Sequence, residues 1–333
     1  TNMSDYATAI QIMENLTSIP DELKITYQSV CLKYGMQQYN VGQTEDALKN
    51  LSKALKYNLS NTIAAQSKFW TAQIQNEKSE YNKSIKTFEE YFDLSNGLYG
   101  LPDESSPFVG HYTQGYNYLM LKDFRNAEKS FKNALVGFNI NSATIKNKDL
   151  TDKIWPDALL RTGDCLFKAN KYKDAMGFYD EVIRKKQGGF VYAMYQKGMI
   201  EGLMGEPYEK ILTLRDVKTQ YPNSDFADDA LLQLGDTYFE LENVDNAYAS
   251  FVELTTKYKN SPLKNAAYLK LGLIAYNKGD MNAAISHYKA IFQNNPSSKE
   301  AESALLGLQE IYINDLGQSE EYVAFVSSIP GYK

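Results

Sequence analysis

Apolar residues recur along the chain at helical spacing, and one arrangement of small, apolar and aromatic positions returns every 35 to 48 residues. In each copy, a first apolar helix carries one small residue. In the first seven copies a second helix follows, with alanine or a substitute (Ser84, Lys210) twelve positions after the small residue and a large apolar residue four positions later. The clearest copies lie at residues 230–251, 266–288 and 302–312. This pattern predicts helix pairs that bury their apolar faces only by stacking on neighbouring pairs.

Small residues mark the first helix of eight predicted units, and all but one of them are glycine. A residue without a large side chain lets the second helix approach closely, and the large apolar residue of that helix fills the space beside it. These small residues are Gly35, Ala72, Gly115, Gly163, Gly198, Gly235, Gly272 and Gly307. The sequence therefore predicts an all-α solenoid of about eight helix-turn-helix repeats.

Three departures from the repeat carry information. Two long intervals coincide with turn-rich stretches at 93–108 and 136–155, which predict extended connections. In the fifth unit Lys210 replaces the alanine and Pro207 enters the second helix, which predicts the least tightly packed pair.

The repeat pattern also sets the expected organisation of the chain, which is a single solenoid over residues 1–333. It comprises an orphan second helix (1–20), repeats 1 and 2 (21–108), repeat 3 with its long connection (109–155), repeats 4 to 7 (156–297) and an incomplete terminal repeat (298–333). Because neither end completes a capped repeat, we expect a segment of a longer array.

These residues closely resemble the tetratricopeptide-repeat family over nearly the whole chain. Residues 221–312, which include "YPNSDFADDALLQLGDTYFE", are similar to repeats of bacterial envelope proteins of the outer-membrane-assembly lipoprotein and periplasmic cell-division coordinator type. The resemblance implies a right-handed α-α superhelix that acts as a protein-binding scaffold in the cell envelope. A cytoplasmic adaptor is the alternative location.

Composition narrows the function further. The chain is 43% hydrophobic and 23% charged, as expected for a folded domain, and its net charge of -6 argues against nucleic-acid binding. No apolar run is long enough to predict a membrane-spanning segment. The two cysteines, Cys31 and Cys165, lie in apolar helical stretches, which predicts buried free thiols.

Motifs for catalysis are missing from the sequence. The two histidines, His111 and His287, belong to different repeats, and no HExxH, CxxC, phosphate-binding glycine loop or GxSxG elbow occurs. We interpret His111 as a packing residue. The sequence therefore predicts a protein that is not an enzyme, with no cofactor, no metal site and no small-molecule ligand.

The family resemblance implies that first-helix positions three before, one after and four after the small residue line the inner wall. Some members of the family bind the C-terminal carboxylate of a peptide with lysine and asparagine at these positions, and this wall lacks that pattern. The wall is instead aromatic and apolar, which predicts a peptide or protein partner. The expected partner-binding residues are Phe69, Tyr112, Tyr116, Phe167, Tyr195, Phe239 and Tyr276. Packing between repeats is the alternative role for each of them. Since the chain has 26 tyrosines, whose rings can stack on sugars, glycan binding in nutrient uptake is the alternative function.

Overall fold

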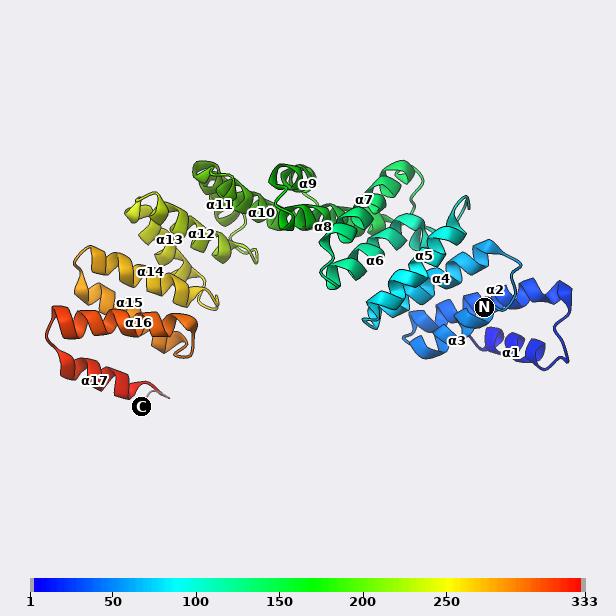
Figure 1. The fold of residues 1–333 in the computed structure, drawn as a ribbon, viewed down its shortest axis with the longest axis horizontal. Coiled ribbons are helices and arrows are strands. Elements are labelled where there is room, and N and C mark those ends of the chain that lie inside the picture. Colours follow the sequence, from blue (N-terminus) through cyan, green and yellow to red (C-terminus); the bar gives the residue numbers. More distant parts are fainter. Residues whose placement is uncertain (1–2, 331–333) are drawn as a thin grey trace. The chain divides into compact units, whose positions relative to one another are not determined.

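A computed structural model describes residues 3–330, and within that range the regular secondary structure is helical throughout. The chain forms two compact units, of which the first ends at Gly189 and the second begins at Phe190. Each unit is built from consecutive helix pairs (Figure 1).

In the first unit, helix α1 precedes four pairs, α2 with α3, α4 with α5, α6 with α7, and α8 with α9. The helices are α1 (Met3–Glu14), α2 (Asp21–Asn40), α3 (Thr44–Ala54), α4 (Asn61–Glu77), α5 (Tyr81–Ser95), α6 (Pro107–Met120), α7 (Phe124–Asn141), α8 (Trp155–Lys168) and α9 (Tyr172–Lys185). A short 3₁₀ turn, η1 (Asp103–Ser105), precedes α6, and a π-helical turn, η2 (Leu150–Ile154), leads into α8.

The second unit has the same construction. Its helices are α10 (Phe190–Leu203), α11 (Pro207–Gln220), α12 (Ala227–Glu240), α13 (Val244–Lys257), α14 (Lys264–Asn277), α15 (Met281–Asn294), α16 (Lys299–Gln309) and α17 (Ser319–Ser328). A π-helical turn, η3 (Glu310–Asp315), extends α16. The predicted all-α architecture of paired helices is confirmed.

Inside the pairs, the predicted contact between the glycine and the large apolar residue is present. A Cβ atom placed on Gly115 would lie 2.6 Å from Phe131, and one on Gly163 would lie 2.8 Å from Tyr179. The partner stands sixteen positions after the glycine in both cases. Contacts below 3 Å leave no room for a methyl group, so these glycines set the distance between the two helices.

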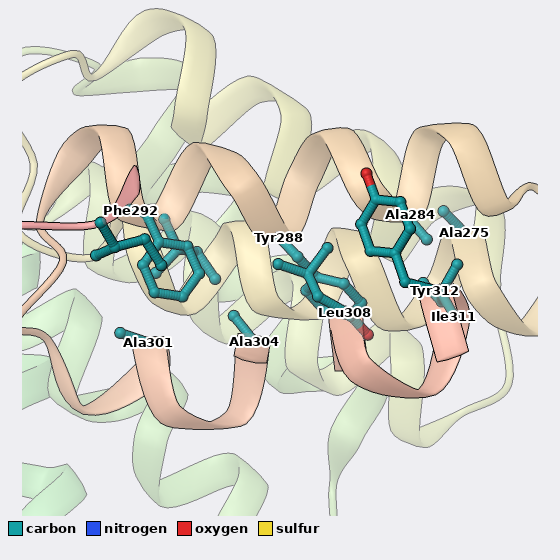
Figure 2. Packing of buried hydrophobic residues seen from close by; sticks show 11 residues of the cluster. Ala275, Ala284, Tyr288, Phe292, Ala301, Ala304, Leu308, Ile311 and Tyr312 are labelled. Atoms are coloured by element: carbon teal, nitrogen blue, oxygen red, sulfur yellow. The ribbon is translucent and has the colours of Figure 1, made fainter. Parts of the chain in front are cut away.

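The last pairs of the second unit show how neighbouring repeats share one side chain. One edge of the Tyr288 ring occupies the space beside Gly272, and the other edge lies against Gly307 of the next repeat. Alanines at 275, 284, 301 and 304 belong to the same buried cluster, and these small side chains let the helices approach closely (Figure 2). The ring of Tyr288 therefore packs on the glycine of its own repeat and on the glycine of the next repeat.

The turn inside each of the first seven pairs contains one residue in the left-handed region, seven positions after the small residue of the first helix. Glycine fills this position at 42, 205 and 279, whereas Ser79, Lys122, Asn170 and Glu242 adopt φ values of 58 to 61° there. A side chain in this region is strained, so the close helix packing holds the turn in a conformation that these four residues disfavour.

Of the two predicted connections, the one at 136–155 is shorter than expected. Helix α7 continues to Asn141, and residues 148 and 149 are again helical ahead of η2, so only residues 142–147 lie between helical segments. Phe138 explains the extension, because its ring is 2% exposed and packs 4.5 Å from the ring of Phe108, which gives α7 one more buried turn. Residues 96–102 do form an irregular connection, as predicted.

The fifth pair, α10 with α11, has a closed core despite its lysine. Ile211, Leu214 and Val217 are buried, and the aliphatic part of Lys210 covers Gly202. The Lys210 ammonium donates to Gln233 Oε1 at 3.0 Å. The lysine therefore fills the place of the alanine with its stem and directs its charge to the next repeat.

Both cysteines are buried and free, as predicted. Within residues 3–330, no helix combines the length and the apolar character that crossing a bilayer demands.

Candidate partner-binding surface

Two of the predicted partner-binding residues, Tyr112 and Tyr116, lie one turn apart on the first helix α6. Pro107 begins this helix, where its fixed φ and missing N–H are favourable. Both tyrosines are half-buried, and their ring centroids are 5.2 Å apart with an angle of 74° between the ring planes. They therefore present ring edges and parts of ring faces, held against Phe131 of α7.

The two hydroxyl groups meet at one carboxylate of the next repeat. Tyr112 Oη donates to Asp157 Oδ2 at 2.9 Å, and Tyr116 Oη donates to the same oxygen. Asp157 lies in the first turn of α8, which is the first helix of the following pair. This carboxylate therefore joins α6 to α8.

Arg161 extends the network along α8. Its Nε and Nη2 atoms each lie 3.2 Å from Asp157 Oδ1, and its Nη1 donates to Asp164 Oδ2 at 2.6 Å. Asp164 Oδ1 in turn accepts a hydrogen bond of 2.7 Å from Tyr179 of α9. Three tyrosine hydroxyls, two carboxylates and one guanidinium are thus connected across three helices.

Burial and the neighbouring charges fix the protonation states of these groups. Burial raises the pKa of Tyr116 to about 12 and raises that of Tyr112 further, and the charge of Asp157 acts in the same direction on both. Burial opposes the charge of Arg161, but the two carboxylates outweigh it and raise the pKa of the guanidinium. At neutral pH the two tyrosines are therefore protonated and Arg161 is charged.

The spacing of residues 157, 161 and 164 places these side chains on one face of a helix, a pattern typical of intrahelical ion pairs. Arg161 was nevertheless missed in the sequence analysis, because it lies outside the positions that the family resemblance assigns to the wall. Asp157 was missed for the same reason. Phe167, which was predicted, is half-buried near the end of α8 with its ring 5.8 Å from that of Tyr172.

In the second unit, the predicted residues are half-buried on separate first helices. The Tyr195 ring of α10 stacks on Phe226 with centroids 5.8 Å apart. On α12, the Phe239 ring lies 5.7 Å from the ammonium of Lys270, which pairs with Asp236 at 2.9 Å. Tyr276 of α14 hydrogen bonds to Asp315, and this bond raises the pKa of the tyrosine.

Phe69 does not lie on this surface. It is 1% exposed, and its ring packs edge-on against Phe88 and Tyr91 of α5 at 5.7 and 5.4 Å. In the α4–α5 pair the position three before the small residue therefore faces the second helix, and Phe69 is removed from the predicted partner-binding set.

Other chemistry has little support at these positions. Sugar binding favours flat, exposed ring faces, whereas Tyr112 and Tyr116 are tilted by 74° and half-buried. His111 stacks on Phe92 with centroids 4.0 Å apart, and burial lowers its pKa to about 4, which agrees with the packing role predicted for it. Among the described residues, no group of three or more His, Cys, Asp and Glu side chains is arranged to hold a metal ion.

Comparison with known families identifies the repeats. Residues 157–185 and 192–224 match one tetratricopeptide-repeat family model, and residues 232–299 match a second one. These residues are tetratricopeptide repeats, and the chain resembles tetratricopeptide-repeat proteins of the bacterial envelope. Its fold is that of scaffolds for protein–protein interaction.

Individual relatives are distant. The chain is 25% identical over 174 residues to the outer membrane protein assembly factor BamD of Caulobacter vibrioides, and the match covers 49% of each chain. The chain thus spans about half the length of this curated relative.

Solved structures show the same fold. The C-terminal part of a tetratricopeptide-repeat protein from Cytophaga hutchinsonii is similar with a TM-score of 0.61 and 15% identity, covering 82% of this chain and 99% of the other. YrrB, described as a tetratricopeptide-repeat protein with an unusual peptide-binding site, has a TM-score of 0.51 and 18% identity, covering 69% of this chain and 98% of the other.

Proposed function

We propose that this protein is a non-enzymatic scaffold that binds a peptide or protein segment on the first-helix face of α6 and α8. The observation that carries the proposal is the network of Tyr112, Tyr116, Asp157 and Arg161, which joins two repeats at a half-buried surface. Aromatic and arginine side chains of this kind dominate binding energy at protein interfaces.

The network explains how such a surface can bind without first becoming ordered. Each tyrosine hydroxyl is held by Asp157, and Asp157 is held by Arg161, so the rotamers are set before a partner arrives. Ordering a flexible side chain at an interface costs about 0.5–1.5 kcal/mol, and a preorganised side chain avoids that cost. The tyrosine rings supply apolar contact area for the partner.

The place of action that we propose is the bacterial cell envelope, in the assembly of envelope complexes. The similarity to BamD over about half of each chain supports this location. Fractionation of cells that express the full-length protein tests it. Recovery with membranes or in the periplasm is expected, and recovery in the cytosol alone would contradict it.

The binding proposal is tested with a displayed library of random peptides selected on the purified protein. Peptides that bind wild type are then measured against a variant carrying Tyr112→Ala and Tyr116→Ala. We expect a loss of about tenfold or more for peptides that use this face. Tyr81→Ala on α5 is the control, since this tyrosine lies on a second helix.

Helicity and thermal unfolding of each variant show whether a loss is local. If every selected peptide binds the double variant with wild-type affinity while the fold is retained, the surface has been placed wrongly. A variant with Tyr112→Phe and Tyr116→Phe keeps the rings and removes the donors, and it separates ring contact from preorganisation.

A further inference from the structure

Helix α7 carries an exposed stripe that takes no part in the core. Residues four or three positions apart lie on one face of a helix, and here that face is formed by Arg125, Lys129, Asn133, Val136 and Ile140. All five are exposed, with Val136 at 57% and Ile140 at 76%. The stripe is basic in its first half and apolar in its second half.

The basic half forms a cluster in a chain whose net charge is -6. Lys132 and Lys171 share the single carboxylate of Glu128, at 2.6 and 3.6 Å. Arg125 and Lys129 have no acidic side chain within ion-pair distance among the described residues. These side chains line a shallow depression in the surface. Its four cations, Arg125, Lys129, Lys132 and Lys171, outnumber its one carboxylate, Glu128, and leave an excess of positive charge.

The helix dipole does not account for these charges. Cations are stabilising near the C-terminus of a helix, and Arg125 and Lys129 lie in the first two turns of α7. Their position costs the folded protein some stability, and no partner within the described residues offsets this cost.

The apolar half opens into a cleft of about 830 Å³. Val136 and Gly137 of α7 form one side of the cleft. The connection at 98–103 forms another side, with Tyr99 and Leu101. Phe108 and His111 of α6 also line the cleft. Tyr99 is 96% exposed. Asn133 lines both the cleft and the basic depression, so the two are continuous.

Hydrogen bonds between the two connections hold the outer end of the cleft in place. Asp103 accepts from the backbone N–H groups of Lys146 and Asn147 at 2.8 and 3.2 Å. Glu104 accepts from the Asn147 side chain at 2.9 Å. Asp103 and Lys146 both line the cleft, so their charges offset each other, and the excess charge of the groove remains that of the basic half.

We infer that this groove is a second docking site, which binds an extended acidic segment of a partner protein that carries a bulky apolar side chain a few residues from its acidic residues. The acidic residues would lie over Arg125 and Lys129, and the apolar side chain would enter the cleft beside Val136. From Arg125 to Ile140 the helix rises about 22 Å, which about seven extended residues can span.

A protein segment fits the groove better than the other anionic partners. The charge and the apolar residues follow one another along the helix, and the apolar residues line a hollow that a flat bilayer surface cannot fill. A nucleic-acid backbone would pair with the basic half but has no apolar group for the cleft.

The test is a displayed random-peptide library selected on wild type and counter-selected on a variant with Arg125→Glu and Lys129→Glu. Both residues are exposed, so this variant retains its fold. The expected outcome is enrichment of peptides with acidic residues a few positions from a bulky apolar residue. We expect their affinity to fall about tenfold or more in this variant and in one with Val136→Asp and Ile140→Asp.

A variant with Lys33→Glu and Lys86→Glu is the matched control, because it changes the net charge equally at exposed lysines on α2 and α5. Its binding is expected to equal that of wild type. Raising the salt concentration from about 50 to about 300 mM weakens the enriched peptides, since their charges meet at an exposed surface.

Three results would overturn this inference. One is the absence of any peptide that distinguishes wild type from the Arg125→Glu, Lys129→Glu variant. Another is an equal loss in the control variant. The third is binding of phosphatidylglycerol vesicles or of duplex DNA that depends on Arg125 and Lys129 when no acidic peptide does. The variant with Tyr112→Phe and Tyr116→Phe is expected to bind the enriched peptides with wild-type affinity. A wrong assignment of the α7 groove can therefore be told apart from a wrong assignment of the α6–α8 face.

Discussion

The ring of Phe131 occupies the space that a side chain at Gly115 would need. A Cβ atom on Gly115 would lie 2.6 Å from Cε1 of that ring, and Phe131 is fully buried. The ring cannot move aside without displacing Tyr112 and Tyr116, whose rings are 6.0 and 5.4 Å from it. The contact that closes the α6–α7 pair therefore also supports the proposed partner-binding surface.

We predict that Gly115→Ala destabilises the protein by about 1–3 kcal/mol, because overpacking forces the ring or the helix to shift. Chemical denaturation measures the change. Gly177→Ala in α9 is the control, since a Cβ there has no neighbour within 4 Å and alanine favours the helix. Equal stability of the two variants would contradict the close contact.

Loss of the charge at Asp157 is expected to destabilise the folded protein. Asp157→Asn weakens hydrogen bonds from two tyrosines and leaves Arg161 with one carboxylate partner, which should cost about 1–3 kcal/mol. The matched control is Asp149→Asn, because the ion pair of Asp149 with Lys153 is exposed on both sides and contributes little. A similar effect of the two changes on the unfolding midpoint would count against a stabilising network.

Glu242 stands in the left-handed region with φ at 58°. Replacing it with glycine is expected to stabilise the protein by about 0.5–1 kcal/mol, because glycine adopts this conformation without strain. Ala249→Gly, at an exposed site within α13, is expected to do the opposite by about 1 kcal/mol. Thermal unfolding of both variants tests whether Glu242→Gly raises the stability and Ala249→Gly lowers it.

The stability of the protein is expected to decrease as the pH falls from 6.5 toward 4, in part because of His111. Burial lowers the pKa of this histidine from 6.5 to about 4. Between these values the unfolded chain binds the proton and the folded chain does not, so protonation favours unfolding. The contribution reaches up to about 3 kcal/mol at the acidic end.

His111→Phe separates this effect from that of the carboxylates, which also titrate in the acidic range. The difference in unfolding free energy between wild type and variant should change with pH between 6.5 and 4 and be constant above pH 7. Parallel curves over the whole range would show that His111 is not the cause.

Both thiols are expected to react slowly in the folded protein. Burial raises the pKa of Cys31 to about 11 and that of Cys165 to about 12, so the reactive thiolate is scarce at neutral pH. Labelling with a thiol reagent should be slow in buffer and fast in denaturant. Rapid labelling of either cysteine in buffer would contradict its burial.

Much of the fold could be predicted from the sequence, because its determinants lie within one repeat. The spacing from Gly163 to Tyr179 is written in the chain, and the close contact of these two residues follows from pairing the two helices that carry them. The same reasoning placed Tyr112 and Tyr116 on a first helix, where both are found. It failed for Phe69, because the position of a residue in the repeat does not say how far the second helix covers it.

The repeat pattern also did not predict the length of α7. Residues 136–141 contain glycine and asparagine and were read as part of a connection, yet contact of Phe138 with Phe108 keeps them helical. A tertiary contact thus outweighed local propensity, which is a weak determinant by comparison. This added turn places Ile140 at the end of the exposed stripe.

By itself, the sequence determined that the chain folds into helix pairs, which residues close each pair, and that the fold belongs to protein-binding repeats. Helical periodicity and side-chain size suffice for the helix pairs, because they act between residues close in the chain, whereas the protein-binding class follows from the family resemblance. Only the tertiary structure decided which side chains meet between repeats. Asp157 lies 45 positions from Tyr112 and across a connection, so their hydrogen bond depends on how one pair stacks on the next. The groove along α7 depends in the same way on two connections that the repeat pattern does not describe.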